Sequence, residues 1–347
     1  MVGFCIFGAG RMGQLHARTL FENDKATLQC VYDVIPAAAQ ELAERYGARV
    51  APDVQTALAS EDVDAVIITT PAGSHVELVI EAARAGKAIF TEKPLSEDIQ
   101  TARLAIQEIR QAGVITAMGF MKRFEPSHYK LIQAVKSNQI GRVELVVLTN
   151  RDIHVTILEL ARETHKSAPY TLLRESTVHD FDLARVLLGE EPVEVYVAGS
   201  CLVEPEFQTM GEIDAAMTTL STGSGQMCHI NNIWRTQYGY DQRIEVFGSK
   251  GMLRAENRPE TSVMHFREDG ILLDRLIPSS EEAWASDDFF MPKYAAAYPH
   301  EMNLFVEAVI SGEPPLVTIY DGYRAQLIVE AAVQSLSTNQ PVPVDKE

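Results

Sequence analysis

The chain has 347 residues, 46% of them hydrophobic, which is enough for a sizeable core and typical of two domains. Its formal net charge of −18 argues against nucleic acids and anionic membranes as partners, because their phosphates would be repelled. No apolar run reaches the roughly 18 residues that would span a bilayer. The N-terminus leads directly into a predicted strand, and no signal peptide is visible.

The four cysteines, Cys5, Cys30, Cys201 and Cys228, are far apart and form no Cys-x-x-Cys pair. Cys5 and Cys30 fall within predicted core strands, where cysteine behaves as a small buried apolar residue. We therefore expect a reducing compartment, the cytoplasm.

The first 33 residues predict a dinucleotide-binding unit. Val2–Phe7 is a short apolar run, and the glycine turn GAGRMG at residues 8–13 follows it. A helical stretch leads to a second apolar segment, Ala26–Tyr32, which ends at Asp33. Dinucleotide-binding folds show this order of strand, Gly-x-Gly-x-x-Gly turn, helix, strand and acid. An ordinary glycine turn in an α/β protein is the alternative.

Each glycine of this turn has a separate physical task. Gly8 permits a tight turn, Gly10 lets the backbone approach a pyrophosphate, and Gly13 lets the helix lie close to the strand. The helix N-terminus then offers free N–H groups and a partial positive charge to the phosphates.

Asp33 bears on which dinucleotide binds. It stands 20 residues after Gly13, where a carboxylate can accept both ribose hydroxyls of an adenosine. It would repel a 2′-phosphate, and the residues Val34, Ile35 and Pro36 that follow include no cation to offset this repulsion. We therefore predict NAD rather than NADP as the cofactor.

Strands and helices alternate along residues 1–120, which predicts a parallel, doubly wound sheet. The further strands that we expect are 50–52, 65–70, 88–91 and 114–119, and the further helices are 37–46, 75–85 and 98–111. Residues 1–120 are therefore predicted to form a dinucleotide-binding domain. Ligands of such a domain lie outside the carboxyl ends of the strands.

The pattern changes after residue 120, so we predict a second domain over residues 121–347. A helix at 126–137, a strand at 143–150 and a helix at 177–188 come first. Longer strands joined by short turns follow, at 193–202, 215–221, 226–234, 243–247, 251–255 and 262–266. They predict an open, mostly antiparallel sheet, and helices at 294–311 and 322–336 close the chain. We expect ligands at the junction of the two domains.

A first candidate for chemistry is the segment TEKPL at residues 91–95, at the carboxyl end of a predicted strand. A residue that precedes a proline is held extended, so the amine of Lys93 would be aimed rather than free. The alternative is an ordinary surface lysine in a loop.

A second candidate is the pair Glu175 and His179, four residues apart near the start of a predicted helix. At this spacing the two side chains can touch, and a carboxylate beside a histidine fixes its tautomer and tunes it for acid–base work. The histidine could instead cap or pack the helix. A metal site is a further alternative, but no third ligand has suitable spacing.

A third candidate is YGYDQR at residues 238–243, which is rich in hydroxyl and amide groups, as a polyol site would be. A hairpin with surface tyrosines is the alternative here.

Taken together, these segments resemble the Gfo/Idh/MocA oxidoreductase family, and within it the inositol 2-dehydrogenase branch. The resemblance rests on the glycine turn at 8–13, EKP at 92–94, GFMKRFEP at 119–126, NRD at 150–152, VHDFDLAR at 178–185, YGYDQRIEVFGSKG at 238–251 and FFMPKYAAAY at 289–298. It implies an α/β plus α+β fold, in which an N-terminal Rossmann domain precedes an open-faced, mostly antiparallel β-sheet domain. A hydride-transfer site would lie between them.

The resemblance also implies roles for single residues. Lys93, His179 and Glu175 match the family's catalytic lysine, histidine and carboxylate. Cofactor-binding roles are expected for Gly8, Gly10, Arg11, Met12, Gly13, Asp33, Thr70, Pro71, His75, Glu92 and Lys93. Substrate-binding roles are expected for Lys93, Arg123, Asp152, Glu175, His179 and Tyr238.

The chain departs from the branch around its predicted catalytic carboxylate. Glu175 stands where the branch usually has Asp, and residues 168–173 (APYTLL) replace a pair of glycines. The loop before them, residues 153–167, is longer and lacks a proline-rich start. An extra methylene moves a carboxylate by about an ångström, which is enough to alter positioning.

The sequence thus predicts an NAD-dependent dehydrogenase that oxidises a secondary hydroxyl of a cyclic polyol or sugar to a ketone, without a metal. One alternative is a family member that uses tightly held NAD in a redox-neutral sugar reaction. Another is a nucleotide-binding regulatory protein that has lost catalysis. An exposed sheet face in the second domain would favour pairing between subunits, and the resemblance implies a homodimer or homotetramer.

Overall fold

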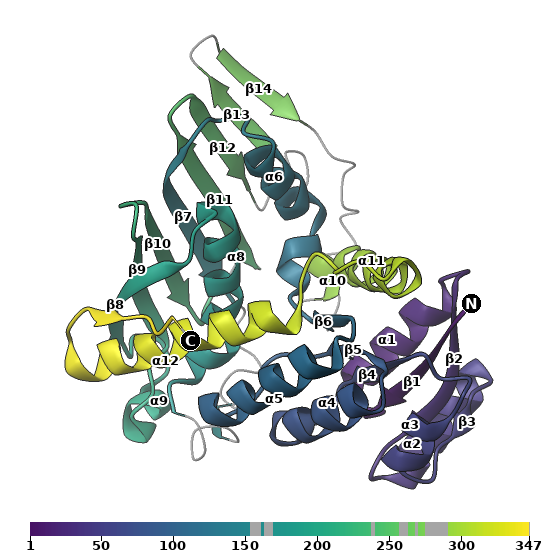
Figure 1. Cartoon of the computed structure of the whole chain (residues 1–347). Helices are drawn as coiled ribbons and strands as arrows, with labels where there is room; N and C mark the ends of the chain where they lie inside the picture. Colours follow the sequence, from purple (N-terminus) through teal and green to yellow (C-terminus); the bar gives the residue numbers. More distant parts are fainter. Residues whose placement is uncertain are drawn as a thin grey trace. The chain divides into compact units, whose positions relative to one another are not determined.

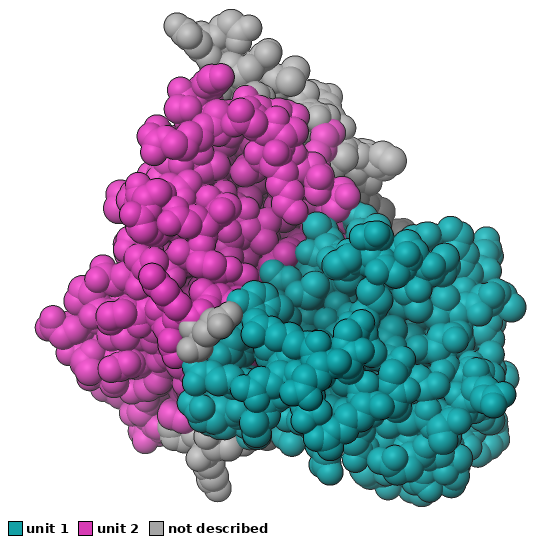
Figure 2. All heavy atoms as spheres, in the orientation of Figure 1, with its two compact units in different colours: residues 1–121, 298–323 teal, residues 122–297, 324–347 magenta. Residues whose placement is uncertain are grey.

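The computed structural model describes residues 1–152, 161–162, 169–236, 240–256, 263–267, 270–274 and 291–346 (Figure 1). These residues form two compact units (Figure 2). Unit 1 contains residues 1–121 and 298–323, and unit 2 contains residues 122–297 and 324–347.

Unit 1 is built on a six-stranded parallel sheet with the strand order β3-β2-β1-β4-β5-β6. Its strands are β1 (Val2–Phe7), β2 (Ala26–Tyr32), β3 (Arg49–Val50), β4 (Ala65–Ile68), β5 (Ala88–Thr91) and β6 (Thr116–Met118). The central strands β1, β4 and β5 are buried throughout, as expected for a parallel sheet that is covered on both faces. The predicted Rossmann topology is confirmed.

Helices accompany the strands of this sheet (Figure 1). They are α1 (Arg11–Phe21), α2 (Pro36–Tyr46), α3 (Val54–Ala59), α4 (His75–Arg84), α5 (Ile99–Ala112) and, from late in the chain, α11 (Ala297–Ser311). Residues of α1, α2 and α11 are buried in one apolar cluster with strand residues. Asp53 and Asp98 cap α3 and α5 by accepting N–H hydrogen bonds from residues three positions later.

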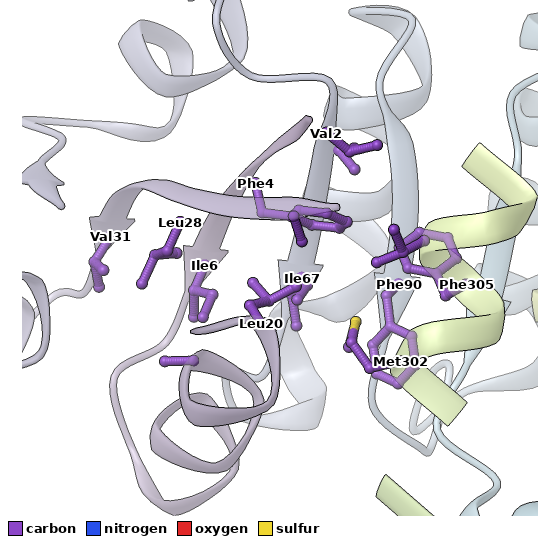
Figure 3. Packing of buried hydrophobic residues seen from close by; sticks show 14 of the residues in the cluster. Val2, Phe4, Ile6, Leu20, Leu28, Val31, Ile67, Phe90, Met302 and Phe305 are labelled. Atoms are coloured by element: carbon purple, nitrogen blue, oxygen red, sulfur yellow. The ribbon is translucent and has the colours of Figure 1, made fainter. Parts of the chain in front are cut away.

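Helix α11 completes the core of unit 1, although some 180 residues separate it from β6. Met302, Phe305 and Val306 are buried in one apolar cluster with strand residues. Phe305 lies against Phe4 and Phe90, with ring centroids 6.1 and 5.7 Å apart (Figure 3). Aromatic pairs at such distances add stabilisation to the burial of their apolar surface.

Unit 2 contains a nine-stranded sheet with the order β14-β13-β12-β11-β7-β10-β9-β8-β15. Among the described strand pairs of this sheet, only β7 and β10 are parallel; the other neighbours are antiparallel. The strands are β7 (Val143–Arg151), β8 (Pro192–Ser200), β9 (Ala215–Thr222), β10 (Met227–Ile233), β11 (Asp241–Gly248), β12 (Gly251–Ala255), β13 (Val263–Arg267), β14 (Gly270–Asp274) and β15 (Val342–Pro343).

One face of this sheet is covered and the other is open, as predicted. Along β9, Ala216, Thr218 and Leu220 are buried, whereas the alternate residues Met217 and Thr219 are exposed. Alternation with a period of two is the mark of a sheet that is packed on one side only.

The helices of unit 2 are α6 (Pro126–Lys136), α8 (Val178–Leu188), α9 (Pro205–Met210), α10 (Met291–Tyr294) and most of α12 (Ile319–Thr338). Helix α8 packs on β7 and β10. The π-helical turn η3 (Leu172–Thr177) leads directly into α8, so helical structure starts earlier than the predicted residue 177. No helix in the described part of the chain is long and apolar enough to cross a bilayer.

Candidate active site

Packing inside unit 1 explains two of the three glycines in the turn after β1. Gly8 has a φ of 100°, and a Cβ atom there would lie 2.8 Å from the backbone of Thr69 and Thr70. A Cβ atom on Gly13 would lie 2.0 Å from the carbonyl oxygen of Gly8. A side chain at either position would push α1 or the loop after β4 away from β1.

Gly10 is different, because the protein itself does not require a glycine there. Its φ of −69° suits any residue, and no heavy atom of the described chain lies within 4 Å of where its Cβ would be. A group that approaches the backbone from outside would require it, as the predicted pyrophosphate does. Arg11, which begins α1, is exposed beside it, and Met12 is half-buried.

Asp33 follows β2 and is held by two backbone groups. The Ala9 N–H donates to Oδ2 at 2.6 Å, and the Ile35 N–H donates to Oδ1 at 2.8 Å. These bonds fix the carboxylate beside the glycine turn, and each oxygen keeps further acceptor capacity for a ribose hydroxyl. The next residue, Val34, is 82% exposed and uncharged, so it does not neutralise the Asp33 carboxylate.

The loops after β4 and β5 carry the remaining predicted cofactor residues. His75 contacts both loops and so connects them. The buried imidazole of His75 places Nε2 2.7 Å from the carbonyl oxygen of Thr70 and Nδ1 2.7 Å from that of Pro94. The predicted residues Thr70, Pro71 and His75 are thus brought together in one loop cluster with the EKP segment. His75 contacts backbone at both nitrogens, as a residue that supports the loops would.

Glu92 and Lys93 follow β5, and the bond between Lys93 and Pro94 is cis. Glu92 Oε1 lies 2.8 Å from Nε2 of His16, a fully buried residue of α1. The sequence analysis missed His16, although its position three residues after Gly13 places it on the same face of α1. This contact connects the helix that follows the glycine turn to the segment that carries Lys93.

In unit 2, Glu175 lies within η3 and His179 lies in the first turn of α8. Glu175 is half-buried and His179 is 6% exposed. A π-helical turn is rare and is found most often at functional sites. Glu175 and His179 therefore lie on one continuous helical segment, which begins before the predicted helix start at residue 177.

A network of buried side chains anchors the start of α8 to the sheet. The Lys122 ammonium donates to Asp180 Oδ1 at 2.7 Å. The amides of Asn150 on β7 and Asn232 on β10 donate to Asp180 Oδ2 at 2.7 and 2.9 Å. Asp180 follows His179 directly, so these bonds fix the backbone that carries His179. Sequence patterns alone did not identify Lys122, Asn150, Asn232 or Asp180.

Asp152 was predicted to bind substrate, and it is part of the same network. The Ser176 hydroxyl donates to Asp152 Oδ2 at 2.8 Å. Burial raises the pKa of the Asp152 carboxyl above its ordinary value, because a charged carboxylate loses hydration there. Asp152 directly follows β7 and is bonded to Ser176. It therefore lies next to the helical segment that carries Glu175 and His179.

Arg123 lies in a buried ion pair. Its Nε donates to Asp182 Oδ2 at 2.6 Å, and its Nη2 donates to Oδ1 of the same carboxylate. This bidentate geometry holds the guanidinium against α8. Tyr238, the last predicted substrate residue, lies outside the described residues.

No group of three or more His, Cys, Asp or Glu side chains among the described residues could hold a metal ion. The four cysteines are free thiols. The open space at Gly10 and the fixed carboxylate of Asp33, by contrast, fit a bound dinucleotide.

Comparison with known families and proteins identifies this architecture. Residues 2–120 match the Gfo/Idh/MocA oxidoreductase family with its NAD-binding Rossmann fold, and residues 132–344 match the C-terminal alpha/beta domain of that family. The chain is 36% identical to the inositol 2-dehydrogenase of Rhizobium meliloti, over 99% of both chains. It is also 36% identical to the myo-inositol 2-dehydrogenase of Thermotoga maritima, over 98% of both.

Solved structures are similar over the same length. The structure of a scyllo-inositol dehydrogenase from Lactobacillus casei with bound NAD(H) and scyllo-inositol matches with a TM-score of 0.84 and 26% identity, over 99% of both chains. The described glycine turn, the parallel sheet and the open-faced sheet domain agree with these matches. The chain therefore belongs to the Gfo/Idh/MocA family and is an oxidoreductase with an NAD-binding Rossmann domain.

Proposed function

We propose that this protein is an NAD-dependent dehydrogenase that oxidises a secondary hydroxyl of an inositol-like cyclic polyol or sugar to a ketone. The observation that carries the proposal is full-length similarity to two inositol 2-dehydrogenases, in a chain that keeps Lys93 and His179. Fold alone would not carry it, because one fold serves many reactions.

Oxidation of an alcohol requires that its hydroxyl proton leaves as the hydride departs. His179 takes that proton as general base, and Glu175 orients the imidazole and favours its charged form. The Lys93 ammonium binds the reacting oxygen and stabilises the negative charge that develops on it. Bound NAD supplies the hydride acceptor.

The cofactor-binding part of the proposal assigns NAD rather than NADP. Asp33 is held by the Ala9 and Ile35 N–H groups, so it cannot easily turn away from a 2′-phosphate. The exposed Val34 offers such a phosphate no positive charge. Gly10 and the N-terminus of α1 would receive the pyrophosphate.

The substrate-binding part is supported most directly for Asp152. Its carboxyl shares the network of Ser176 and Asn150 beside the segment of Glu175 and His179. Its carboxylate oxygens can accept hydrogen bonds from polyol hydroxyls. The roles of Arg123 and Tyr238 stay predictions.

The test is a substrate panel with purified enzyme. Myo-inositol, scyllo-inositol, other inositols, hexoses and glycosides are each incubated with NAD or NADP, and NADH or NADPH formation is followed by absorbance. We expect at least one inositol to give sustained NADH production. In the His179→Ala variant we expect kcat to fall by roughly 10²–10⁴, the usual contribution of a positioned base. Lys93→Met should abolish turnover but leave NAD binding, measured by calorimetry, largely intact.

Two results would refute the proposal. Cofactor that copurifies and is recycled without NADH accumulation would favour a redox-neutral sugar reaction. NAD binding without turnover of any panel member would favour a non-catalytic regulatory protein.

We further propose that the enzyme works in the cytoplasm as a homodimer or homotetramer. The open face of the unit 2 sheet supports the assembly of subunits, because it exposes the apolar side chains of Met217, Met227 and Phe247. Light scattering coupled to gel filtration measures the assembly directly, and a monomer at micromolar concentration would contradict it.

A further inference from the structure

The helical segment that carries Glu175 and His179 starts with an unusual residue. Tyr170 has a φ of 65°. Three non-glycine residues of the described chain have positive φ, and the other two are asparagines, which adopt this region readily. A tyrosine there costs free energy, so surrounding contacts must hold it in place.

Glu212 supplies those contacts from a distant part of unit 2. Its carboxylate accepts the Tyr170 N–H at 2.9 Å through Oε1 and the Thr171 N–H at 3.0 Å through Oε2. The Thr171 hydroxyl donates to Oε1 at 3.2 Å. Glu212 is 3% exposed, and it lies between α9 and β9, 42 residues after Tyr170.

This arrangement replaces an ordinary helix cap. The first N–H groups of a helix have no partner within the helix, and a Ser, Thr, Asp or Asn at its start usually satisfies one of them. Tyr170 cannot do so with its side chain, although its carbonyl oxygen accepts the Leu173 N–H at 2.9 Å. The Glu212 carboxylate instead accepts the N–H groups at the start of the helix. Its negative charge also interacts favourably with the positive end of the helix dipole.

The segment is also held at its far end. Asp180 is fixed by Lys122, Asn150 and Asn232, as described above. Glu175 thus lies on a short π-helical turn between two anchors, one at residues 170–171 and one at residue 180. A shift at either anchor would move the turn and with it the carboxylate of Glu175.

We propose that Glu212 is a positioning residue, whose carboxylate holds the left-handed start at Tyr170 and thereby sets where Glu175 points. The consequence is a specificity effect: Glu212 contributes to the choice among cyclic polyols through Glu175, without touching the substrate itself. This inference rests on the proposed function for its substrate readout. The structural part of the inference, the anchoring of residues 170–176, does not depend on the proposed function.

The experiment compares four variants with the wild type: Glu212→Ala, Tyr170→Gly, the double variant and Glu206→Gln as a matched control. Glu206 also belongs to the α9 region, but its carboxylate pairs with Arg162 and is 40% exposed. Hydrogen exchange of the amides of residues 170–176, kcat and KM for NAD, and relative kcat/KM over the inositol panel are measured for each.

We expect Glu212→Ala to speed amide exchange at residues 170–176. It should lower kcat by about tenfold or more, within the roughly hundredfold that an ångström of misplacement costs. Relative kcat/KM among inositols should change, whereas KM for NAD should stay the same. Glu206→Gln should match the wild type in every measurement.

The double variant tests the physical reason. Glycine adopts a φ of +65° at little cost, so it should keep the start of the segment in place without Glu212. The double variant should therefore recover part of the kcat and of the exchange protection that Glu212→Ala loses.

Two results would overturn the proposal. One is a Glu212→Ala variant with wild-type amide exchange at residues 170–176. The other is a variant that is less stable but has wild-type kcat and wild-type relative kcat/KM, which would make Glu212 merely structural. If the wild type oxidises no cyclic polyol, the proposed function fails, while the exchange measurement still supports or overturns the anchoring.

Discussion

The cofactor end of unit 1 and the helical segment at residues 170–180 of unit 2 are held in different ways. The glycine turn is fixed mainly by backbone packing, because Gly8 and Gly13 leave room for Thr69 and for each other. The side chains that bind the turn, among them Asp33 and Thr69, come from its immediate surroundings. The segment of unit 2 is fixed by side chains from many places, among them Lys122, Asn150 and Glu212.

The two regions should therefore be sensitive to different kinds of substitution. A backbone-defined site tolerates changes around it but not an added atom inside it. A site assembled from buried polar side chains depends on every partner, because each unsatisfied buried group costs free energy.

The strongest test of unit 2 is the Asp180→Asn variant. It leaves the Lys122 ammonium buried without its counter-charge, since both side chains are 5% exposed or less. Removing one partner of a buried pair costs about 3–5 kcal/mol, so the urea midpoint should fall strongly. The Lys122→Met/Asp180→Asn double variant should recover much of that loss. Equal stability of the two variants would mean that the ion pair does not hold the segment.

The matching test of unit 1 compares two glycines of one turn. Gly13→Ala places a Cβ atom 2.0 Å from the Gly8 oxygen and should destabilise the fold by about 1–3 kcal/mol or more. Gly10→Ala meets open space, so its melting temperature should stay at the wild-type value. Calorimetry should nevertheless show weaker NAD binding by Gly10→Ala. Unchanged affinity would show that the cofactor does not approach this backbone.

Cofactor choice should depend on the carboxylate of Asp33, which tests how much one side chain matters at a site that is otherwise defined by its backbone. The Asp33→Ser/Val34→Arg variant removes a repulsive charge and adds a phosphate partner. The ratio of kcat/KM for NADP to that for NAD should rise by at least about tenfold, the equivalent of one charge-assisted hydrogen bond. A wild type that already prefers NADP would contradict this interpretation of Asp33.

The smallest expected effect concerns the carboxylate of Glu175. Shortening it by one methylene, in Glu175→Asp, changes hydrogen-bond geometry more than charge. We expect relative kcat/KM among inositols and hexoses to shift several-fold, and overall activity to change less. If relative specificity does not change, any difference in substrate between this chain and the inositol 2-dehydrogenase branch would depend on the loop before residue 170 and not on Glu175.

A contiguous motif made the first unit predictable from sequence. The strand, glycine turn, helix, strand and Asp33 lie within 33 residues, and each step follows from the one before by local geometry. The alternation of strands and helices up to residue 120 then predicts a parallel sheet, because each helix returns the chain to the same edge, so that successive strands run in the same direction. The predicted fold class of both units is confirmed, and the longer strands with short turns correctly indicated a mostly antiparallel sheet in the second unit.

The assignments of single residues to the site stay predictions, but the structure shows why some positions could not be found from sequence. His16 and Glu92 are 76 residues apart, and Glu212 and Tyr170 are 42 apart, so no local spacing connects them. Lys122 and Arg123 are adjacent and both cationic, and only the fold decides that one pairs with Asp180 and the other with Asp182.

The sequence by itself determined the parts of this protein whose physics is local: the glycine turn, the periodicity of its strands and helices, and the four-residue spacing of Glu175 and His179. The tertiary structure alone decided the long-range parts. Helix α11 buries Phe305 against β1 and β5 of a sheet that ended some 180 residues earlier, and Glu212 caps a helix that begins 41 residues before it. A side chain's chemistry shows that it needs a partner, but chain folding determines which one comes within hydrogen-bond distance.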